Sequence, residues 1–156
     1  MVQCVEAYLT LAGKPVTCLS KVATPFLDES TAWCPPEGPP TGALAPIALK
    51  VLMKVLYAAR VARPDLLSAT CMMARRVTKW DADCDRRLHR LMCYINSTKD
   101  YVQTSYCGDR MDDLKLALFC DADFAGDKSD SRSTTGVVVC VAGPTTFFPI
   151  VTLSKT

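Results

Sequence analysis

A change in hydrophobic periodicity near residue 100 constrains the fold more than any other feature of the sequence. Between residues 46 and 96, apolar side chains recur every three or four residues, which is typical of helices that bury one face. From residue 101 onward, the apolar residues form short alternating runs separated by turn-forming residues, which is typical of strands. Helices followed by strands predict an α+β fold class.

The helical part divides into three segments, 46–62, 64–79 and 81–96. Arg63 ends the first because a residue before proline avoids the helical region, and Pro64 suits the first turn of the second. In 81–96 the apolar stripe consists of Cys84, Leu88, Leu91, Met92 and Ile95. A short helix is also expected over 1–12, and the proline-rich run at 34–42 reads as a linker.

Three strands are expected over 114–123, 134–143 and 145–153, joined as an antiparallel meander. Both faces of LKLALFCDAD (114–123) are mostly apolar, which favours a central position for this strand. Pro149 has no N–H to donate, so the third strand should lie at an edge or carry a bulge.

Composition narrows the class of protein. With 156 residues, 49% of them hydrophobic, the chain is long enough to bury a core, and its net charge of +2 does not by itself indicate a nucleic-acid partner. The nine cysteines lack any Cys-x-x-Cys pair and are expected to be free thiols. No secretory signal or membrane-spanning run is recognised. The sequence therefore predicts an intracellular protein of the cytoplasm or nucleus, not secreted and without a membrane partner.

One compact group of acidic residues follows the first expected strand. It consists of Asp121 and Asp123, with Asp127 and Asp130 beyond. These carboxylates could hold a divalent metal, or they could simply begin a solvated loop. An EF-hand is excluded because Ala125 and Arg132 occupy ligand positions, and an aspartate-nucleophile phosphatase would need a parallel α/β domain afterwards. A metal-dependent nuclease is the third interpretation.

The charges are segregated along the chain. From Lys50 to Arg90 there are ten Lys and Arg against four Asp, whereas from Asp100 to Asp130 there are eight Asp against three basic residues. This asymmetry suits helices that contact phosphate groups beside an acidic metal site. The predicted contacts are Lys50, Lys54, Arg75, Arg76 and Lys79. The alternative is pairing within the helix, for which Asp83 has Arg86 and Arg87 at suitable spacing.

Four segments resemble the copia-type retrotransposon Pol polyprotein where its reverse transcriptase joins its ribonuclease H. They are ARPDLL (62–67), YINSTKDY (94–101), LALFCDADFAGDKSDSRSTTGVVVCVAG (116–143) and FPIVTLSK (148–155). Residues 8–29 resemble the end of the transcriptase region. The resemblance implies three parts: the transcriptase end and linker (1–43), a helical connection segment (44–108) and a partial ribonuclease H-like domain (109–156). In that fold the first strand lies centrally and the third at an edge.

The resemblance also implies a function. The parent would perform RNA-directed DNA synthesis and hydrolyse RNA in RNA–DNA hybrids, with Asp121 as a catalytic ligand of Mg²⁺ and the rest of the polyprotein as a partner. Asp123 matches the motif without a clear metal role, and Phe124 replaces the family's tryptophan. The sequence stops before the family's glutamate-bearing helix, and no glutamate follows Glu37. We therefore expect a fragment that is inactive alone, or alternatively a noncatalytic module that binds nucleic acid through its basic helices.

Overall fold

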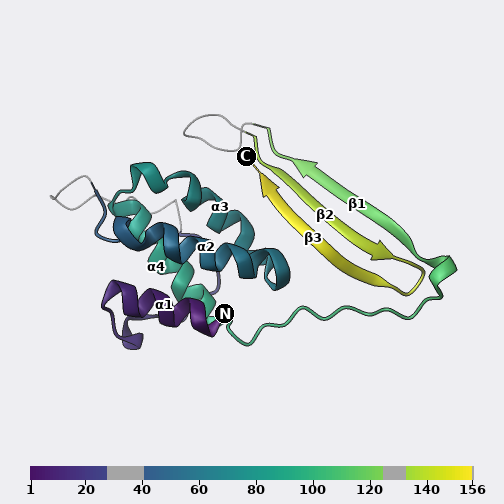
Figure 1. Ribbon diagram of the computed structural model, residues 1–156, viewed down its shortest axis with the longest axis horizontal. Helices are drawn as coiled ribbons and strands as arrows, with labels where there is room; N and C mark the ends of the chain where they lie inside the picture. Colours follow the sequence, from purple (N-terminus) through teal and green to yellow (C-terminus); the bar gives the residue numbers. More distant parts are fainter. Residues whose placement is uncertain (28–40, 125–132, 156) are drawn as a thin grey trace. The chain divides into compact units, whose positions relative to one another are not determined.

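The computed structural model describes residues 1–27, 41–124 and 133–155, in which four α-helices precede three β-strands (Figure 1). The α-helices are α1 (Val2–Ala12), α2 (Ala45–Ala62), α3 (Leu67–Arg75) and α4 (Ala82–Ser97), and the strands are β1 (Lys115–Ala122), β2 (Thr135–Ala142) and β3 (Phe147–Lys155). Short 3-10 turns are η1 (Val16–Cys18), η2 (Pro64–Leu66), η3 (Val77–Lys79) and η4 (Met111–Asp113). The predicted α+β class is confirmed, whereas the ribonuclease H-like assignment stays a prediction.

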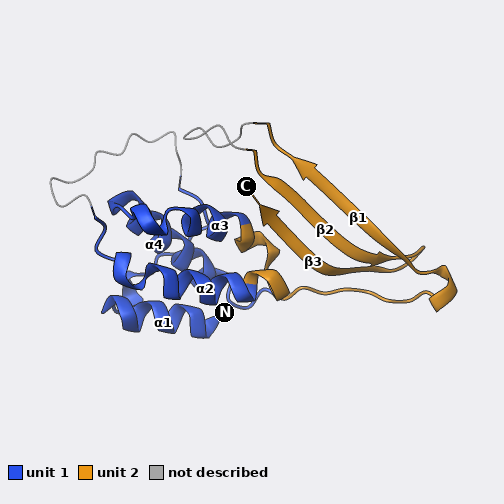
Figure 2. Ribbon diagram, turned by 45° about the horizontal axis from the view of Figure 1, so that its top comes forward, with its two compact units in different colours: residues 1–58, 68–101 blue, residues 59–67, 102–156 orange. Residues whose placement is uncertain are grey.

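The chain forms two compact units, coloured separately in Figure 2. The helical unit comprises Met1–Ala58 and Ser68–Tyr101, and the sheet unit comprises Ala59–Leu67 and Val102–Thr156. The bounds differ from those of the three segments implied by the resemblance, since α1 and α4 lie in one unit. The three-part division of the parent remains a prediction.

Helix α4 forms the centre of the helical unit. All five residues of its predicted apolar stripe are fully buried, as the periodicity indicated. Asp81 is the N-cap: its side chain accepts a hydrogen bond from the Cys84 backbone N–H at 2.8 Å. Asp83 and Asp85 lie in the first turn, where negative charge complements the helix dipole.

The loop after α1 is held against α4 by polar contacts. Gly13 ends α1 with a φ of 62°, a left-handed conformation that glycine adopts without strain. Further along, the Arg90 guanidinium donates to the Thr24 carbonyl oxygen at 2.9 Å, and the Val22 N–H donates to Ser97 Oγ at 3.1 Å. These bonds give the segment after η1 a defined course over α4.

Helix α2 follows its predicted bounds closely, but the predicted helix 64–79 is interrupted. Its α-helical part covers only α3, with η2 before it and η3 after it. The β-branched pair Val77 and Thr78 has low helix propensity, which agrees with the tighter turn at this end.

The sheet is an antiparallel meander in the order β1-β2-β3. Opposite residues share a face, so Leu118, Val139 and Val151 lie side by side. Together with the neighbouring rungs they form one entirely apolar face: Leu116, Leu118, Cys120, Val137, Val139, Val141, Phe148, Val151 and Leu153. This apolar face is largely open, because Leu116 is 71% and Leu118 65% exposed.

The prediction of a central position for the first strand is wrong for this sheet. Strand β1 pairs only with β2 and lies at an edge of the sheet that the described residues form. Apolar residues on both faces of a strand carry no information about the number of neighbouring strands. Cys120, on this strand, is a free thiol and is exposed.

The prediction for Pro149 is confirmed in both of its forms. Strand β3 lies at the other edge of the sheet, and its register with β2 shifts between Val139 and Cys140. Val139 pairs with Val151, while Cys140 pairs with Pro149, so Ile150 is the extra residue of a bulge. The missing N–H of Pro149 therefore falls where the ladder is already irregular.

Candidate functional site

The two acidic residues of the DAD motif lie at the end of β1, but their side chains make different hydrogen bonds. Asp121 is exposed, pairs with Gly136 in the sheet, and accepts a hydrogen bond from the Ala122 N–H at 2.9 Å. The Asp123 carboxylate accepts a hydrogen bond from the Thr134 N–H, and the Asp123 N–H donates to the Thr134 carbonyl at 3.1 Å. Asp123 thus ties together the ends of β1 and β2.

Among the described residues, this arrangement does not supply the full set of carboxylates of a Mg²⁺ centre that cleaves phosphodiesters. Such a centre needs several carboxylates around its ions, and within the described ranges no three His, Cys, Asp or Glu residues come together to hold a metal. Asp127 and Asp130, named with the motif, lie outside the described residues. Asp121 therefore contributes one exposed carboxylate, and no catalytic step follows from it.

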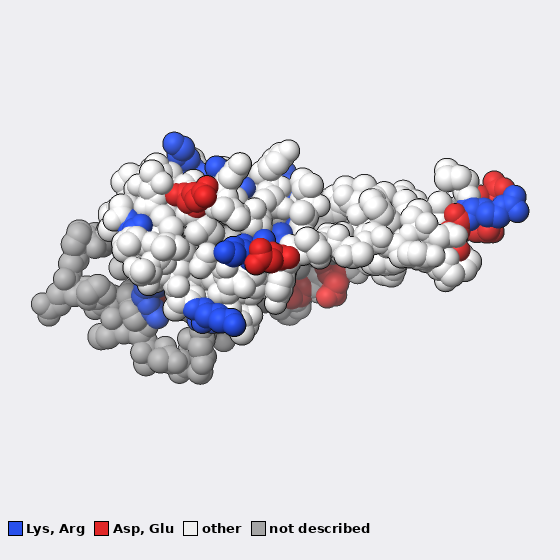
Figure 3. All heavy atoms as spheres, turned by 90° about the horizontal axis from the view of Figure 1, so that it is seen from below, with Lys and Arg blue, Asp and Glu red and all other residues white. Residues whose placement is uncertain are grey.

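The basic residues predicted to contact nucleic acid are divided between α2 and the end of α3 with the segment that follows it. Lys50 and Lys54 are exposed one turn apart on α2, and Lys79 is exposed at the end of η3. On the face of the molecule drawn in Figure 3, uncharged atoms separate the basic side chains, which are not gathered into one patch. Of the five predicted contacts, the structure brings Lys50 and Lys54 onto the same helix face.

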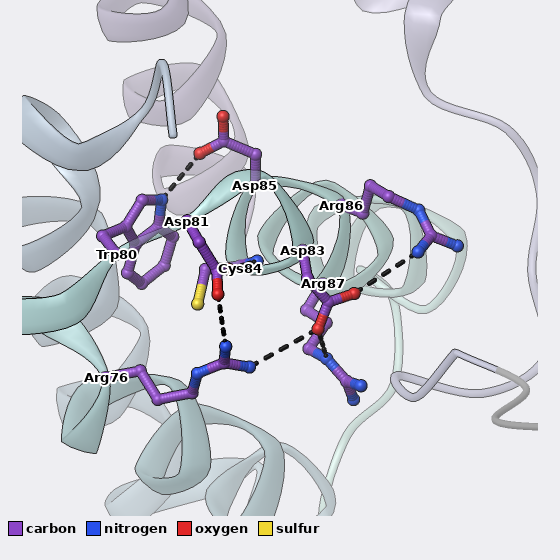
Figure 4. Close-up of polar contacts among 8 residues, drawn as sticks. All are labelled: Arg76, Trp80, Asp81, Asp83, Cys84, Asp85, Arg86 and Arg87. Carbon is purple, nitrogen blue, oxygen red and sulfur yellow. Dashed lines mark hydrogen bonds and ion pairs between the residues drawn. The ribbon is translucent and has the colours of Figure 1, made fainter. Parts of the chain in front are cut away.

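Arg76 is held by ion pairs at the start of α4 (Figure 4). Its guanidinium lies 2.6 Å from the Asp81 carboxylate and 3.4 Å from that of Asp83. Asp83 also pairs with Arg87 at 2.6 Å and with Arg86 at 3.3 Å. The alternative considered for these charges, pairing within the helix, is therefore confirmed for Asp83. Arg75 likewise has an interaction within the described structure.

A second set of contacts, missed by the sequence analysis, joins residues 42–44 to α4. Asp85 Oδ1 accepts hydrogen bonds from Trp80 Nε1 at 2.6 Å and from the Leu44 N–H at 3.1 Å, as Figure 4 shows for Trp80. The Gly42 N–H donates to the Trp80 carbonyl at 3.1 Å. A Cβ on Gly42 would lie 2.4 Å from the Asp81 carbonyl oxygen, so only glycine permits this approach.

A third cluster links α1 to α4 through a tyrosine, a histidine and a cysteine. Tyr8 Oη lies 2.9 Å from His89 Nδ1, and Cys93 Sγ lies 3.6 Å from His89 Nε2. Ser20 Oγ donates to the same sulfur at 3.8 Å. The spacing of His89 and Cys93, one helical turn apart, was a visible signal, but nothing in the sequence connects them with Tyr8.

The chemistry of this Tyr8–His89–Cys93 cluster is that of a partly buried polar network. Burial raises the pKa of the Tyr8 hydroxyl well above its usual range. Burial, and next the charge of Lys14, lowers the pKa of His89 below its ordinary value of 6.5. Cys93 is 1% exposed, so a substrate cannot reach its sulfur without opening the helices. The cluster therefore joins helices, and no reaction follows from it.

The comparisons with known proteins found one similar curated protein. The chain is 31% identical over 101 residues to "Secreted RxLR effector protein 161" of Plasmopara viticola, which covers 61% of this chain. The chain spans 65% of that relative's length. No family model matches the chain, and no solved structure matches it.

This similarity corrects the predicted localisation. The sequence predicts an intracellular protein that is not secreted, whereas the similar protein is by its name a secreted effector. The prediction rested on the pattern of residues 1–12, which the structure shows as an amphipathic helix with Cys4, Val5 and Tyr8 buried. A helix whose apolar residues pack inside the folded protein gives no information about whether the protein is secreted. Among the described helices, none has the length and apolar character needed to cross a bilayer.

Proposed function

We propose that this chain is a piece of a copia-type Pol protein, consisting of its helical connection segment and the first three strands of a ribonuclease H-like domain. The order of elements supports this proposal, since helices precede a β1-β2-β3 meander. The DAD motif at the end of β1 and the bulged edge strand with Pro149 agree with the positions that the resemblance implies.

The role we propose for the chain itself is noncatalytic binding of nucleic acid. The observation that carries this role is at the DAD motif: the Asp123 carboxylate accepts the Thr134 N–H, and among the described residues no group of three metal-ligating side chains includes Asp121. A centre that cleaves phosphodiesters needs several carboxylates around its two metal ions. The exposed lysines of α2 and η3, in contrast, can contact phosphate groups without any metal.

An RNA–DNA hybrid tests both halves of the proposal. We expect the full chain to bind the hybrid at low salt, with an affinity that falls steeply as salt rises, and to leave the hybrid intact in the presence of Mg²⁺. The double variant Lys50→Gln/Lys54→Gln should reduce the slope of log affinity against log salt by about 1.8, that is about 0.9 per lost phosphate contact. Mg²⁺-dependent cleavage that disappears in Asp121→Asn would overturn the noncatalytic role.

The similarity to the Plasmopara viticola protein favours a second candidate function, that of a secreted protein. We would test it by mass spectrometry of the culture medium and of washed cells from the organism that produces the chain. Enrichment of the intact chain in the medium supports secretion. Its confinement to the cells would count against this second candidate.

A further inference from the structure

Helix α2 carries an exposed stripe that combines two lysines with a tyrosine. Lys50, Lys54 and Tyr57 stand at positions i, i+4 and i+7, so they share one helix face over about 10 Å of its axis. Both lysines are exposed, and the Tyr57 side chain is 77% exposed. We call these three residues the α2 stripe. All three belong to the helical unit.

The opposite face of α2 fixes the direction of the stripe. Val51, Leu52 and Val55 are buried almost completely, which prevents rotation of the helix about its axis. The Cys4 thiol donates to the Lys54 carbonyl oxygen at 3.8 Å, so α1 contacts α2 beside the stripe. The stripe is thus presented by a packed helix rather than by a loop.

The charge of the stripe is not balanced locally. Helix α2 has no acidic residue, and within the described ranges no carboxylate pairs with Lys50 or Lys54. Two like charges one turn apart destabilise an isolated helix slightly, and an anion bound across them would remove that cost. The surface is therefore complementary to a polyanion.

Tyr57 adds an aromatic ring to the stripe, and a phosphate group alone cannot stack on that ring. An exposed aromatic ring at one end of a row of cationic side chains offers a base a face on which to stack, while the ammonium groups contact the neighbouring phosphates of the same strand. Bases of a duplex are already stacked and have no free face, so this combination favours unpaired nucleotides. We propose that the α2 stripe binds single-stranded nucleic acid, with Tyr57 as the stacking platform. This inference rests on the proposed nucleic-acid function and deepens it.

Three probes of equal length separate base stacking from charge. They are an oligothymidylate, the same phosphate backbone without bases, and an RNA–DNA hybrid. We expect the full chain to bind the oligothymidylate more tightly than the abasic strand. Tyr57→Ala should weaken oligothymidylate binding by about 5-fold to about 150-fold, the range for loss of one stacked base, and leave abasic binding unchanged. Tyr57→Phe should restore the affinity.

Two controls complete the experiment. Tyr106 is 69% exposed and lies in the sheet unit, so Tyr106→Ala removes a comparable ring and should leave binding unchanged. Circular dichroism should show that Tyr57→Ala unfolds like the unchanged chain, because alanine is a better helix former than tyrosine at an exposed site.

The outcomes distinguish this inference from the proposed function. Equal effects of Tyr57→Ala on the oligothymidylate and abasic strands, or no effect on either, would overturn the stacking role. If Lys50→Gln/Lys54→Gln still weakened binding of the hybrid in that case, the proposed function would stand alone. No binding of any probe at low salt would overturn both.

Discussion

Asp81 combines a helix cap with an ion pair. One carboxylate oxygen accepts the Cys84 N–H at 2.8 Å, and the other lies 2.6 Å from the Arg76 guanidinium. Partial burial acts to raise the pKa of Asp81, but the Cys84 hydrogen bonds and the Arg76 charge outweigh it and hold the pKa below its ordinary value of 3.8. The ionised carboxylate is therefore the form that stabilises α4.

Two substitutions of Asp81 distinguish the stability that comes from the helix cap from the stability that comes from the negative charge. We expect Asp81→Ala to lower the free energy of unfolding by about 1 kcal/mol, the usual value of an N-cap. Asp81→Asn keeps an accepting oxygen and should cost only a few tenths of that. Because the pKa is lower in the folded chain, the contribution is present above pH 4 and is lost as pH falls through the folded pKa. Urea unfolding measures both variants, and equal losses would show that the ion pair, not the cap, dominates.

His89 gives a second pH dependence in a different range. Its pKa is lowered in the folded chain, so the unfolded chain binds more protons as pH falls below 6.5. Stability should therefore decrease from pH 7.5 to pH 5.5, since the neutral ring is the form that fits beside Tyr8 and Cys93. Thermal unfolding across this range measures the effect. The decrease should be absent in His89→Gln, and its persistence there would assign it to another group.

At the scale of elements, the sheet and helix α4 differ in how completely they bury their apolar side chains. The buried stripe of α4 is covered, whereas the apolar face of the sheet exposes large side chains on β1 and β3, with Leu118 at 65% and Leu153 at 43%. The outer edge of β1 also has no partner strand among the described residues. Exposed apolar faces and unpaired edges are the usual sites of association between chains.

A charge on this face should reduce association. We expect Leu118→Lys to lower the sedimentation coefficient at high protein concentration, while leaving stability within about 0.5 kcal/mol because the side chain is mostly exposed. Leu49 on α2 is 51% exposed and provides the matched control, Leu49→Lys, which should not change association. Equal behaviour of the two variants would show that the sheet face is not responsible.

The same elements show which features of the structure can be predicted from local sequence patterns. The bounds of α2, the apolar stripe of α4 and the bulge at Pro149 all agree with the sequence analysis, because each depends on residues within a few positions of one another. The central position that the apolar faces of β1 indicate is wrong for this sheet, since the number of neighbouring strands depends on distant segments. The Asp123 contact with Thr134 was missed for the same reason.

At the scale of the whole molecule, burial is unevenly distributed between the two units. The helical unit holds most of the fully buried large side chains, among them Leu52, Leu88 and Ile95, whereas Cys140 is the fully buried residue of the three strands. Local opening costs little where few apolar side chains are buried. The two units should therefore differ in stability.

Hydrogen exchange on the full chain measures this difference. We expect the amides of α4 to exchange slowest and those of β1 to exchange fastest among the hydrogen-bonded elements, because β1 is an edge strand with exposed faces. Mass spectrometry of peptides from 82–97 and 115–122 resolves the two. Equal protection would show that the strands are covered in solution.

The order of residues alone was sufficient to predict the α+β class, the apolar stripes of the helices and the irregular pairing of the third strand at Pro149. Steric and periodic rules predict these features because they act over one or two turns. Folding in three dimensions decided the contact of Tyr8 with His89, the approach of Gly42 to Asp81 and the open face of the sheet. These features join residues far apart in the chain, and no local spacing specifies which distant surfaces meet. Their energy comes from packing, which exists only once the helices and strands have come together.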